Sequence, residues 1–411
     1  MRRAINQDAH AEVLAESQAQ WESRGHLFIV ADGMGAHVAG ELASKIAVQQ
    51  VPLHYAKLRD LPPAEALFRA INEANAEIHR RGQANIEFRN MGTTCSALVL
   101  LPEGAVIGHV GDSRVYQLRG NRFHQLTFDH SLVWEMQAAG EVTDETARSG
   151  AIPKNVITRS LGPNPTVQVD LEGPFPIRVG DRFLVCSDGL SGQISDEELG
   201  ALLRCLSPQE AARILVDLSN LRGGPDNITA IIVEVVDPRL ETKSHMAIAP
   251  IGAEHSPPKF SPLLAGATAL CWLAALLLLL AGLKPLAAVA AILGLVAAII
   301  GVVQWIGGSG PQQRIARYGK GPYRKYRAEP DRPLFEHLAN TMKSLREAAE
   351  ERGWQIDWGP LEEAFGEARA AADRGDFSTA VALQAKVVST LMEQIRKQRG
   401  SESSQDSSID L

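Results

Sequence analysis

The sequence lacks the signals of several protein classes. Its four cysteines are scattered among 411 residues without paired spacing, so neither a disulfide framework nor a cysteine zinc site is predicted. The formal net charge of −7 gives no global sign of nucleic-acid binding. The basic start MRRAINQD runs into a polar stretch, so no signal peptide is predicted. A protein of a reducing compartment is favoured.

The length and the local composition indicate several regions. A chain of 411 residues predicts two or three domains, and a hydrophobic content of 45% is enough for sizeable cores. Residues 1–237 alternate apolar strands, glycine turns and helices, which predicts an α+β sandwich with helices outside the sheets. Residues 238–262 lose this periodicity and predict a linker. The tail of residues 399–411 is polar and is predicted to be disordered.

The first region has recognisable strands and helices. Six strands are expected in HLFIVAD, CSALVLLP, AVIGHVGDS, RVYQLRG, RFLVCSDG and ITAIIVEVV. Helices are expected over Val38–Val51, Pro63–Gln83, Ser131–Ala139, Ser195–Leu203 and Pro208–Leu221.

Two long apolar runs stand apart at residues 263–306. Each is about twenty residues long, which is the length that crosses a bilayer, and only Lys284 and Pro285 separate them. The pattern predicts a two-pass transmembrane hairpin; the alternative is a pair of buried soluble helices. The basic segment 307–329 predicts that both flanks lie on the cytoplasmic side of the cell membrane. This segment could also be a solvated linker.

Residues 330–398 show helical spacing again. Three amphipathic helices are predicted, and the turn ADRGDFSTAV resembles the turn of a tetratricopeptide-type helical pair. Only one such pair is visible, whereas a solenoid needs about three repeats. A small helical bundle is therefore predicted, with binding of a partner protein as one candidate role.

Aspartates recur where predicted strands end. Asp32 follows a buried strand and precedes Gly33 and Gly35, which allow a sharp turn with an uncovered carbonyl. A carboxylate beside a bare carbonyl suits a hard metal ion; the alternative is that Asp32 only caps the next helix.

Four more aspartates extend this pattern. Asp8 ends the stretch NQD, Asp112 and Asp188 follow apolar strands, and Asp226 stands in a tight loop. Carboxylates that converge from neighbouring strands repel one another unless their pKa values rise or a cation binds. Oxygen ligands without cysteine favour Mg²⁺ or Mn²⁺ over zinc.

Taken together, the motifs resemble a known family. RAINQD, VADGMGAHVAGELAS, MGTTCSALVL, GHVGDSRVYQL, LTFDHS, ITRSLG, FLVCSDGLSGQISDEEL and GGPDNITAIIVEV occur in the order found in bacterial type 2C metal-dependent protein serine/threonine phosphatases, over roughly residues 2–236. The resemblance implies two stacked antiparallel sheets flanked by helices and a centre of two Mn²⁺ or Mg²⁺ ions, with a third position in bacterial relatives.

The resemblance also implies roles for individual metal ligands. Asp32 would bridge the two ions, and the Gly33 carbonyl would bind one of them. Asp188 and Asp226 would bind the other ion. Asp112, together with Asp188, would form the third position.

Two further residues take roles from the same resemblance. Asp8 would hold a water molecule of the metal centre. Arg3 stands where the family has its phosphate-binding arginine, and a guanidinium can hold two phosphate oxygens at once. Met34 replaces a histidine of some relatives, so solvent is expected to protonate the leaving group.

The expected activity is hydrolysis of phosphoserine and phosphothreonine in proteins by metal-activated water. The natural counterpart would be a bacterial Ser/Thr kinase, and phosphoproteins, including such kinases, would be the partners. No Cys-Arg phosphate loop is present, so no covalent intermediate is expected. Two alternatives stay open: a catalytically weak scaffold that binds phosphoproteins, and a tail that inhibits the catalytic domain.

Overall fold

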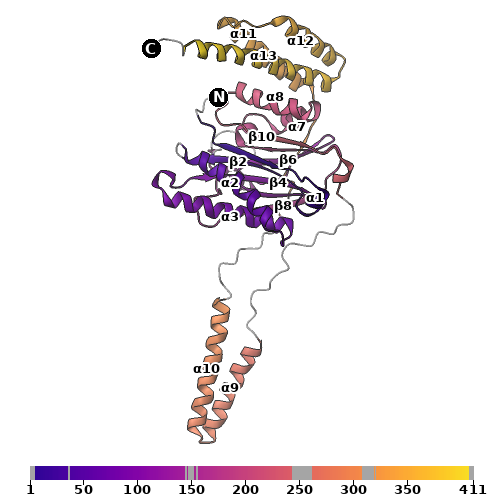
Figure 1. The fold of residues 1–411 in the computed structure, drawn as a ribbon. Coiled ribbons are helices and arrows are strands. Elements are labelled where there is room, and N and C mark those ends of the chain that lie inside the picture. Colours follow the sequence, from indigo (N-terminus) through magenta and orange to yellow (C-terminus); the bar gives the residue numbers. More distant parts are fainter. Residues whose placement is uncertain are drawn as a thin grey trace. The chain divides into compact units, whose positions relative to one another are not determined.

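The structure is a computed structural model of the chain. It describes residues 5–35, 38–143, 146, 152–153, 156–242, 262–307, 319 and 321–406. Contacts divide the chain into two compact units, one of residues 1–248 with 318–411 and one of residues 249–317. The first unit contains the predicted α+β fold (Figure 1).

Two antiparallel sheets form the centre of the first unit. The first sheet has the strand order β1-β2-β4-β5-β8, with the short β3 paired to β2. Its strands are β1 (Asp8–Val13), β2 (His26–Met34), β3 (Gly92–Thr93), β4 (Cys95–Leu101), β5 (Gly104–Val110) and β8 (Asp170–Phe175). The second sheet has the order β10-β9-β6-β7-β11. Its strands are β6 (Arg114–Arg119), β7 (Arg122–Gln125), β9 (Arg182–Cys186), β10 (Ala230–Glu234) and β11 (Arg324–Arg327).

Apolar side chains from the two sheets meet in one core. Phe28 and Val30, two residues apart on β2, share a buried cluster with Phe183 and Val185, two residues apart on β9. This spacing places each pair on one face of its strand. Each large apolar side chain buried in this way contributes about 1.5–3 kcal/mol to folding.

Helices cover the outer faces of the sheets. α2 (Ala39–Lys57) packs on β2, and α3 (Pro63–Ala84) packs on β5, where a Cβ at Gly108 would come within 2.5 Å of Ile71. α7 (Asp196–Cys205) and α8 (Pro208–Leu221) cover the second sheet, and each begins with a Ser–Glu capping box. The shorter elements are α1 (Gln18–Arg24), η1 (Ile86–Phe88), α4 (Leu132–Ala138), α6 (Asp188–Ser191) and η2 (Pro238–Leu240).

The α+β prediction is confirmed, since the six expected strands and five expected helices are present, with ends that differ by a few residues. Five strands were missed: β1, β3, β7, β8 and β11. Each is only 2–6 residues long, and β1, β8 and β11 lie at sheet edges.

The basic segment predicted as juxtamembrane contains a strand of the catalytic fold. β11 pairs with β7 in register, with Arg324 opposite Gln125 and Arg327 opposite Arg122. The prediction of a juxtamembrane linker over the whole of residues 307–329 is therefore wrong for these four residues. Residues 308–318 and 320 lie outside the described part of the chain.

The predicted helical bundle is present but is not separate. It consists of α11 (Arg332–Glu351), α12 (Trp358–Asp373) and α13 (Phe377–Asp406). Leu338 of α11 and Leu391 of α13 belong to the same buried cluster as Leu202 of α7 and Leu215 of α8. The bundle and the second sheet therefore share one hydrophobic core. α13 also continues to Asp406, into the tail predicted to be disordered.

The second unit is a helical hairpin. It consists of α9 (Pro262–Leu280) and α10 (Lys284–Gly307), which pack against each other. Many of its large apolar side chains are exposed, among them Leu276, Leu280 and Ile292. In the described part of the chain, however, no helix is both long enough and apolar enough to cross a membrane. The prediction of two membrane spans is not supported.

Candidate metal centre

Asp8 and Asp32 face each other across two neighbouring strands. Asp8 begins β1 and stands directly opposite Asp32 on β2. Directly opposed residues of an antiparallel pair project to the same face of the sheet, so the two carboxyl groups lie on one side. Burial raises the pKa of Asp32 well above its ordinary value, and the charges of Asp8 and Asp188 raise it further.

Asp188 joins this pair from the second sheet. It follows β9 and begins α6, and its charge is among the causes that raise the pKa of Asp32. The charge of Asp188 also helps to raise the pKa of Asp8 and of Asp112. Asp188 therefore lies at the point where the ends of the two sheets meet.

Asp112 and Asp226 complete the predicted acidic group. Asp112, in the turn after β5, is 6% exposed; burial and then the charge of Asp188 raise its pKa to about 8. The charge of Asp226, in the loop before β10, helps to raise the pKa of Asp8, for which burial is the largest cause. The structure thus links the five predicted aspartates electrostatically, with Asp188 acting on Asp8, Asp32 and Asp112, and Asp226 acting on Asp8.

The donor set fits a hard divalent cation. Oδ1 of Asp8 and Oδ1 of Asp112 are buried and have no hydrogen-bond partner among the described residues. Leaving a buried carboxylate oxygen unsatisfied costs free energy, and a cation would remove that cost and the mutual repulsion. Within the described residues, no three His, Cys, Asp or Glu side chains are already spaced as ligands of one ion.

Hydroxyl groups hold the backbone of Asp32. Thr94 Oγ1 accepts a hydrogen bond from Asp32 N at 2.8 Å, and Thr93 Oγ1 donates to Asp32 O at 2.9 Å. Ser113 Oγ lies 2.8 Å from Thr94 Oγ1 and links this support to the turn that carries Asp112. Thr93 and Thr94 therefore fix the backbone position of Asp32.

The segment before Asp8 is held by side chains from distant elements. Asn227 Oδ1 accepts from Gln7 N at 2.9 Å, and Ser44 Oγ donates to Gln7 O at 2.5 Å. Gly33 N also donates to Gln7 O, at 3.2 Å. This loop packs tightly, because a Cβ at Gly33 would lie 2.1 Å from Gly40 O.

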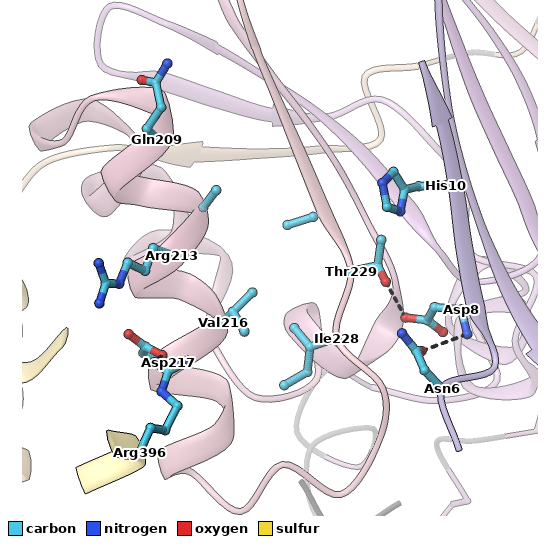
Figure 2. Close-up of a pocket in the computed structure, with 12 residues that line it drawn as sticks. Asn6, Asp8, His10, Gln209, Arg213, Val216, Asp217, Ile228, Thr229 and Arg396 are labelled. Atoms are coloured by element: carbon cyan, nitrogen blue, oxygen red, sulfur yellow. Dashed lines mark hydrogen bonds and ion pairs between the residues drawn. The ribbon is translucent and has the colours of Figure 1, made fainter. Parts of the chain in front are cut away.

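The carboxyl group of Asp8 is held by two hydroxyl groups that sequence reasoning missed. Ser187 Oγ donates to Asp8 Oδ2 at 2.8 Å. Thr229 Oγ1 donates to the same oxygen at 2.8 Å (Figure 2). Both residues adjoin predicted aspartates, Ser187 in CSDG and Thr229 in DNIT. The available signal was a hydroxyl residue close to an aspartate in the sequence: Ser187 directly precedes Asp188, and Thr229 stands three positions after Asp226.

Asp8 also lines a cavity of about 600 Å³ beside α8. Asn6, His10 and Thr229 line it near Asp8, and Asp217 and Arg396 line it at α8 and α13 (Figure 2). The cavity therefore borders both the candidate metal centre and the C-terminal bundle.

Arg3 lies outside the described residues, so its role stays a prediction. His109, on β5, is fully buried between Ser96 Oγ and the Phe128 carbonyl, both 2.9 Å from its ring nitrogens. Burial lowers the pKa of His109 to about 3, which suits a structural role.

Comparison with known proteins agrees with this geometry. The profile of the family described as "Protein phosphatase 2C" matches residues 2–218. The serine/threonine phosphatase stp of Listeria welshimeri is 38% identical over 213 residues, which cover 51% of this chain and 84% of that protein. The protein phosphatase PhpP of Streptococcus pneumoniae is 37% identical over 213 residues, which cover 51% of this chain and 85% of that protein.

A solved structure gives the same result. The serine/threonine phosphatase PstP/Ppp of Mycobacterium tuberculosis aligns with a TM-score of 0.50 and 31% identity, over 58% of this chain and 95% of that one. The chain therefore belongs to the protein phosphatase 2C family and is a serine/threonine phosphatase of the kind that uses Mn²⁺ or Mg²⁺.

Proposed function

We propose that the chain hydrolyses phosphoserine and phosphothreonine in proteins at the centre formed by Asp8, Asp32, Asp112, Asp188 and Asp226. The observation that carries the proposal is the meeting of Asp8, Asp32 and Asp188 from two different sheets: Asp8 stands opposite Asp32, and the charge of Asp188 acts on both. Such a cluster of buried carboxyl groups is costly unless it serves to hold cations.

Each residue has a distinct task in this proposal. Asp32, the Gly33 carbonyl, Asp188 and Asp226 would hold two metal ions. Asp112, together with Asp188, would hold a third.

Two Mn²⁺ or Mg²⁺ ions, when bound, neutralise the phosphate dianion and lower the pKa of water so that hydroxide forms near neutral pH. Asp8 would hold the water molecule that attacks the phosphorus atom. Arg3 would hold the phosphate oxygens, and Met34 leaves protonation of the leaving group to solvent.

The test is hydrolysis of p-nitrophenyl phosphate and of a phosphothreonine peptide by the full chain. We expect activity that requires Mn²⁺, that EDTA abolishes, and that Asp188→Asn lowers by about 100-fold or more. Asp373→Asn, an exposed change on α12, is the control and should leave activity unaltered. Turnover without added metal would contradict the proposal. A folded chain that binds phosphopeptides without hydrolysing them would favour the alternative of a phosphoprotein-binding scaffold.

The location of the enzyme is a further part of the proposal. The support is the apolar surface of the α9–α10 hairpin, where the side chains of Leu276, Leu280 and Ile292 are 53%, 78% and 59% exposed. Exposed apolar surface of this extent is typical of protein or membrane interaction sites. We propose attachment to the cell membrane, with the catalytic unit on the cytoplasmic side, where it would oppose Ser/Thr kinases.

Flotation of the full chain with phospholipid vesicles tests the attachment. Deletion of residues 263–306 should abolish flotation and leave hydrolysis of p-nitrophenyl phosphate intact. Equal flotation of both chains would refute the attachment, and digestion of the catalytic unit from the periplasmic side of intact vesicles would refute the orientation.

A further inference from the structure

The carboxyl group of Asp8 is bound asymmetrically. Its Oδ2 atom accepts two hydrogen bonds, from Ser187 Oγ and from Thr229 Oγ1, each at 2.8 Å. Its Oδ1 atom is buried and has no hydrogen-bond partner among the described residues. One oxygen is thus fixed by the protein, and the other is left for a group that the protein itself does not supply.

The hydrogen bonds of Ser187 show which group donates to Asp8. Ser187 Oγ accepts a hydrogen bond from Thr229 N at 3.0 Å, and Thr229 O accepts one from Ser187 N at 3.1 Å. A serine hydroxyl has a single proton to donate, and the proton of Ser187 goes to Asp8. Ser187 and Thr229 therefore form one unit: these two hydrogen bonds link them to each other, and both hydroxyl groups donate to Oδ2 of Asp8.

The unit joins the two sheets at the candidate metal centre. Asp8 begins the edge strand β1 of the first sheet, whereas Ser187 and Thr229 flank β9 and β10 of the second. The side chain of Asp8 would otherwise be free to rotate at the start of an edge strand. Two hydrogen bonds of 2.8 Å to a charged acceptor hold it in one orientation.

We propose that Ser187 and Thr229 are positioning residues that orient Asp8, so that its Oδ1 atom is presented to the metal centre. This inference rests on the proposed function, because it gives Asp8 a task there. The competing explanation is that the two hydroxyl groups only tie β1 to the second sheet. That explanation predicts a loss of stability without a change in metal affinity.

The test uses Mn²⁺ binding by the full chain, freed of metal and titrated in a calorimeter, a readout that does not depend on turnover. Partners that orient ligands in this way typically affect metal affinity by 10–100-fold. We expect Thr229→Val and Ser187→Ala each to weaken Mn²⁺ binding by about tenfold. Thr229→Ser keeps the hydroxyl group and should bind Mn²⁺ within about threefold of the parent chain. Two independent variants keep the test decisive if one of them fails to fold.

Thr242→Val is the matched control. Its Oγ1 atom accepts a hydrogen bond from Ile177 N at 2.8 Å, away from the aspartates. We expect this variant to lower the melting temperature of the metal-free chain as much as Thr229→Val does, with Mn²⁺ affinity unchanged.

Equal Mn²⁺ affinity in the parent, Thr229→Val and Ser187→Ala would overturn the inference and leave the proposed function standing. Failure of Thr229→Ser to restore binding would also overturn it. No Mn²⁺ binding by the parent chain would overturn the proposed function itself, and this inference with it.

Discussion

Asp217 on α8 accepts a hydrogen bond of 2.6 Å from the hydroxyl group of Ser389 on α13. Asp217 is 1% exposed and also forms an ion pair with Arg396 of α13 (Figure 2). A buried carboxylate of the catalytic fold is therefore satisfied by two side chains of the C-terminal bundle. Removal of either partner leaves the buried Asp217 carboxylate with one interaction fewer. This contact is therefore a sensitive probe of the packing of α13 on α8.

We expect Ser389→Ala to lower the free energy of unfolding by about 1–2 kcal/mol, because a buried charged acceptor loses one of its donors. Arg396→Ala should cost about 1–3 kcal/mol; the Arg396 side chain is 53% exposed, so solvent screening reduces the effect. Urea unfolding followed by circular dichroism measures both.

Lys386→Ala is the control, because Lys386 pairs with Glu210 across the same helices but both side chains are exposed. Its cost should stay within about 1 kcal/mol. Equal costs for all three variants would show that Asp217 has no special place in the docking.

A second prediction concerns truncation of the chain after residue 248. The truncation removes β11 from the edge of the second sheet and uncovers the apolar faces of α7 and α8, including Leu202 and Leu215. Exposed apolar surface and an unpaired strand edge both promote aggregation. We therefore expect residues 1–248 to be poorly soluble or to melt at a lower temperature than the full chain.

The matched control removes residues 249–317 and joins the ends with a long Gly-Ser linker, which keeps the whole first unit. This variant should stay soluble and keep its melting temperature. A stable, fully active fragment of residues 1–248 would indicate that the bundle is dispensable for folding.

These contacts mark the limit of what the sequence could predict. Asp32 and Asp188 were found because each follows a continuous apolar run and precedes glycine, which is a local pattern. The pairing of Arg324–Arg327 with β7 joins segments about 200 residues apart, and nothing local distinguishes this strand from a solvated basic linker. Ser187 and Thr229 were missed for the same reason, since their bonds to Asp8 span 179 and 221 residues.

The fold class was easier to predict than the arrangement of its parts. Long apolar runs and capping residues indicate strands and helices from the local sequence alone. Whether a helical bundle packs on the neighbouring domain depends on which faces become complementary after folding. The stripe that includes Leu338 and Leu391 predicted helices, but not the surface against which they pack.

A third prediction concerns the close approach of two loops. A Cβ at Gly189 would lie 2.0 Å from Asn227 O, a backbone atom that cannot move without its loop. Gly189→Ala should therefore separate the loops that carry Asp188 and Asp226. We expect a loss of stability of about 2 kcal/mol or more from overpacking, together with weaker Mn²⁺ binding. Thermal unfolding and calorimetric Mn²⁺ titration measure the two effects.

Gly366→Ala on α12 is the control for that change. A Cβ at Gly366 meets no atom within 4 Å, so the variant should be unchanged or more stable by up to about 1 kcal/mol. An unaltered Mn²⁺ affinity in Gly189→Ala would show that the two loops do not share a metal position.

The fourth prediction concerns pH. Glu172 on β8 is 1% exposed and accepts hydrogen bonds from the Tyr323 hydroxyl at 2.5 Å and from Gly321 N at 3.2 Å. Burial, with a smaller contribution from the charge of Asp170, raises the pKa of Glu172 from 4.5 to about 7. Between these two pH values the folded chain holds a proton that the unfolded chain has lost. The stability that this proton provides is therefore present at low pH and is lost as pH rises towards 7.

Glu172→Gln removes this titration and keeps an acceptor for the Tyr323 hydroxyl. We expect the stability of the variant, measured relative to the parent by urea unfolding, to increase between pH 4.5 and pH 7.5, by about 3 kcal/mol at most. The comparison cancels the titration of the other buried carboxyl groups, which both chains share.

Tyr323→Phe is the companion variant: it removes a donor that favours the charged form of Glu172, so the loss of stability with rising pH should become steeper. Parallel pH profiles of stability for the parent and Glu172→Gln would contradict the prediction. They would mean that Glu172 has the same pKa in the folded and unfolded chains.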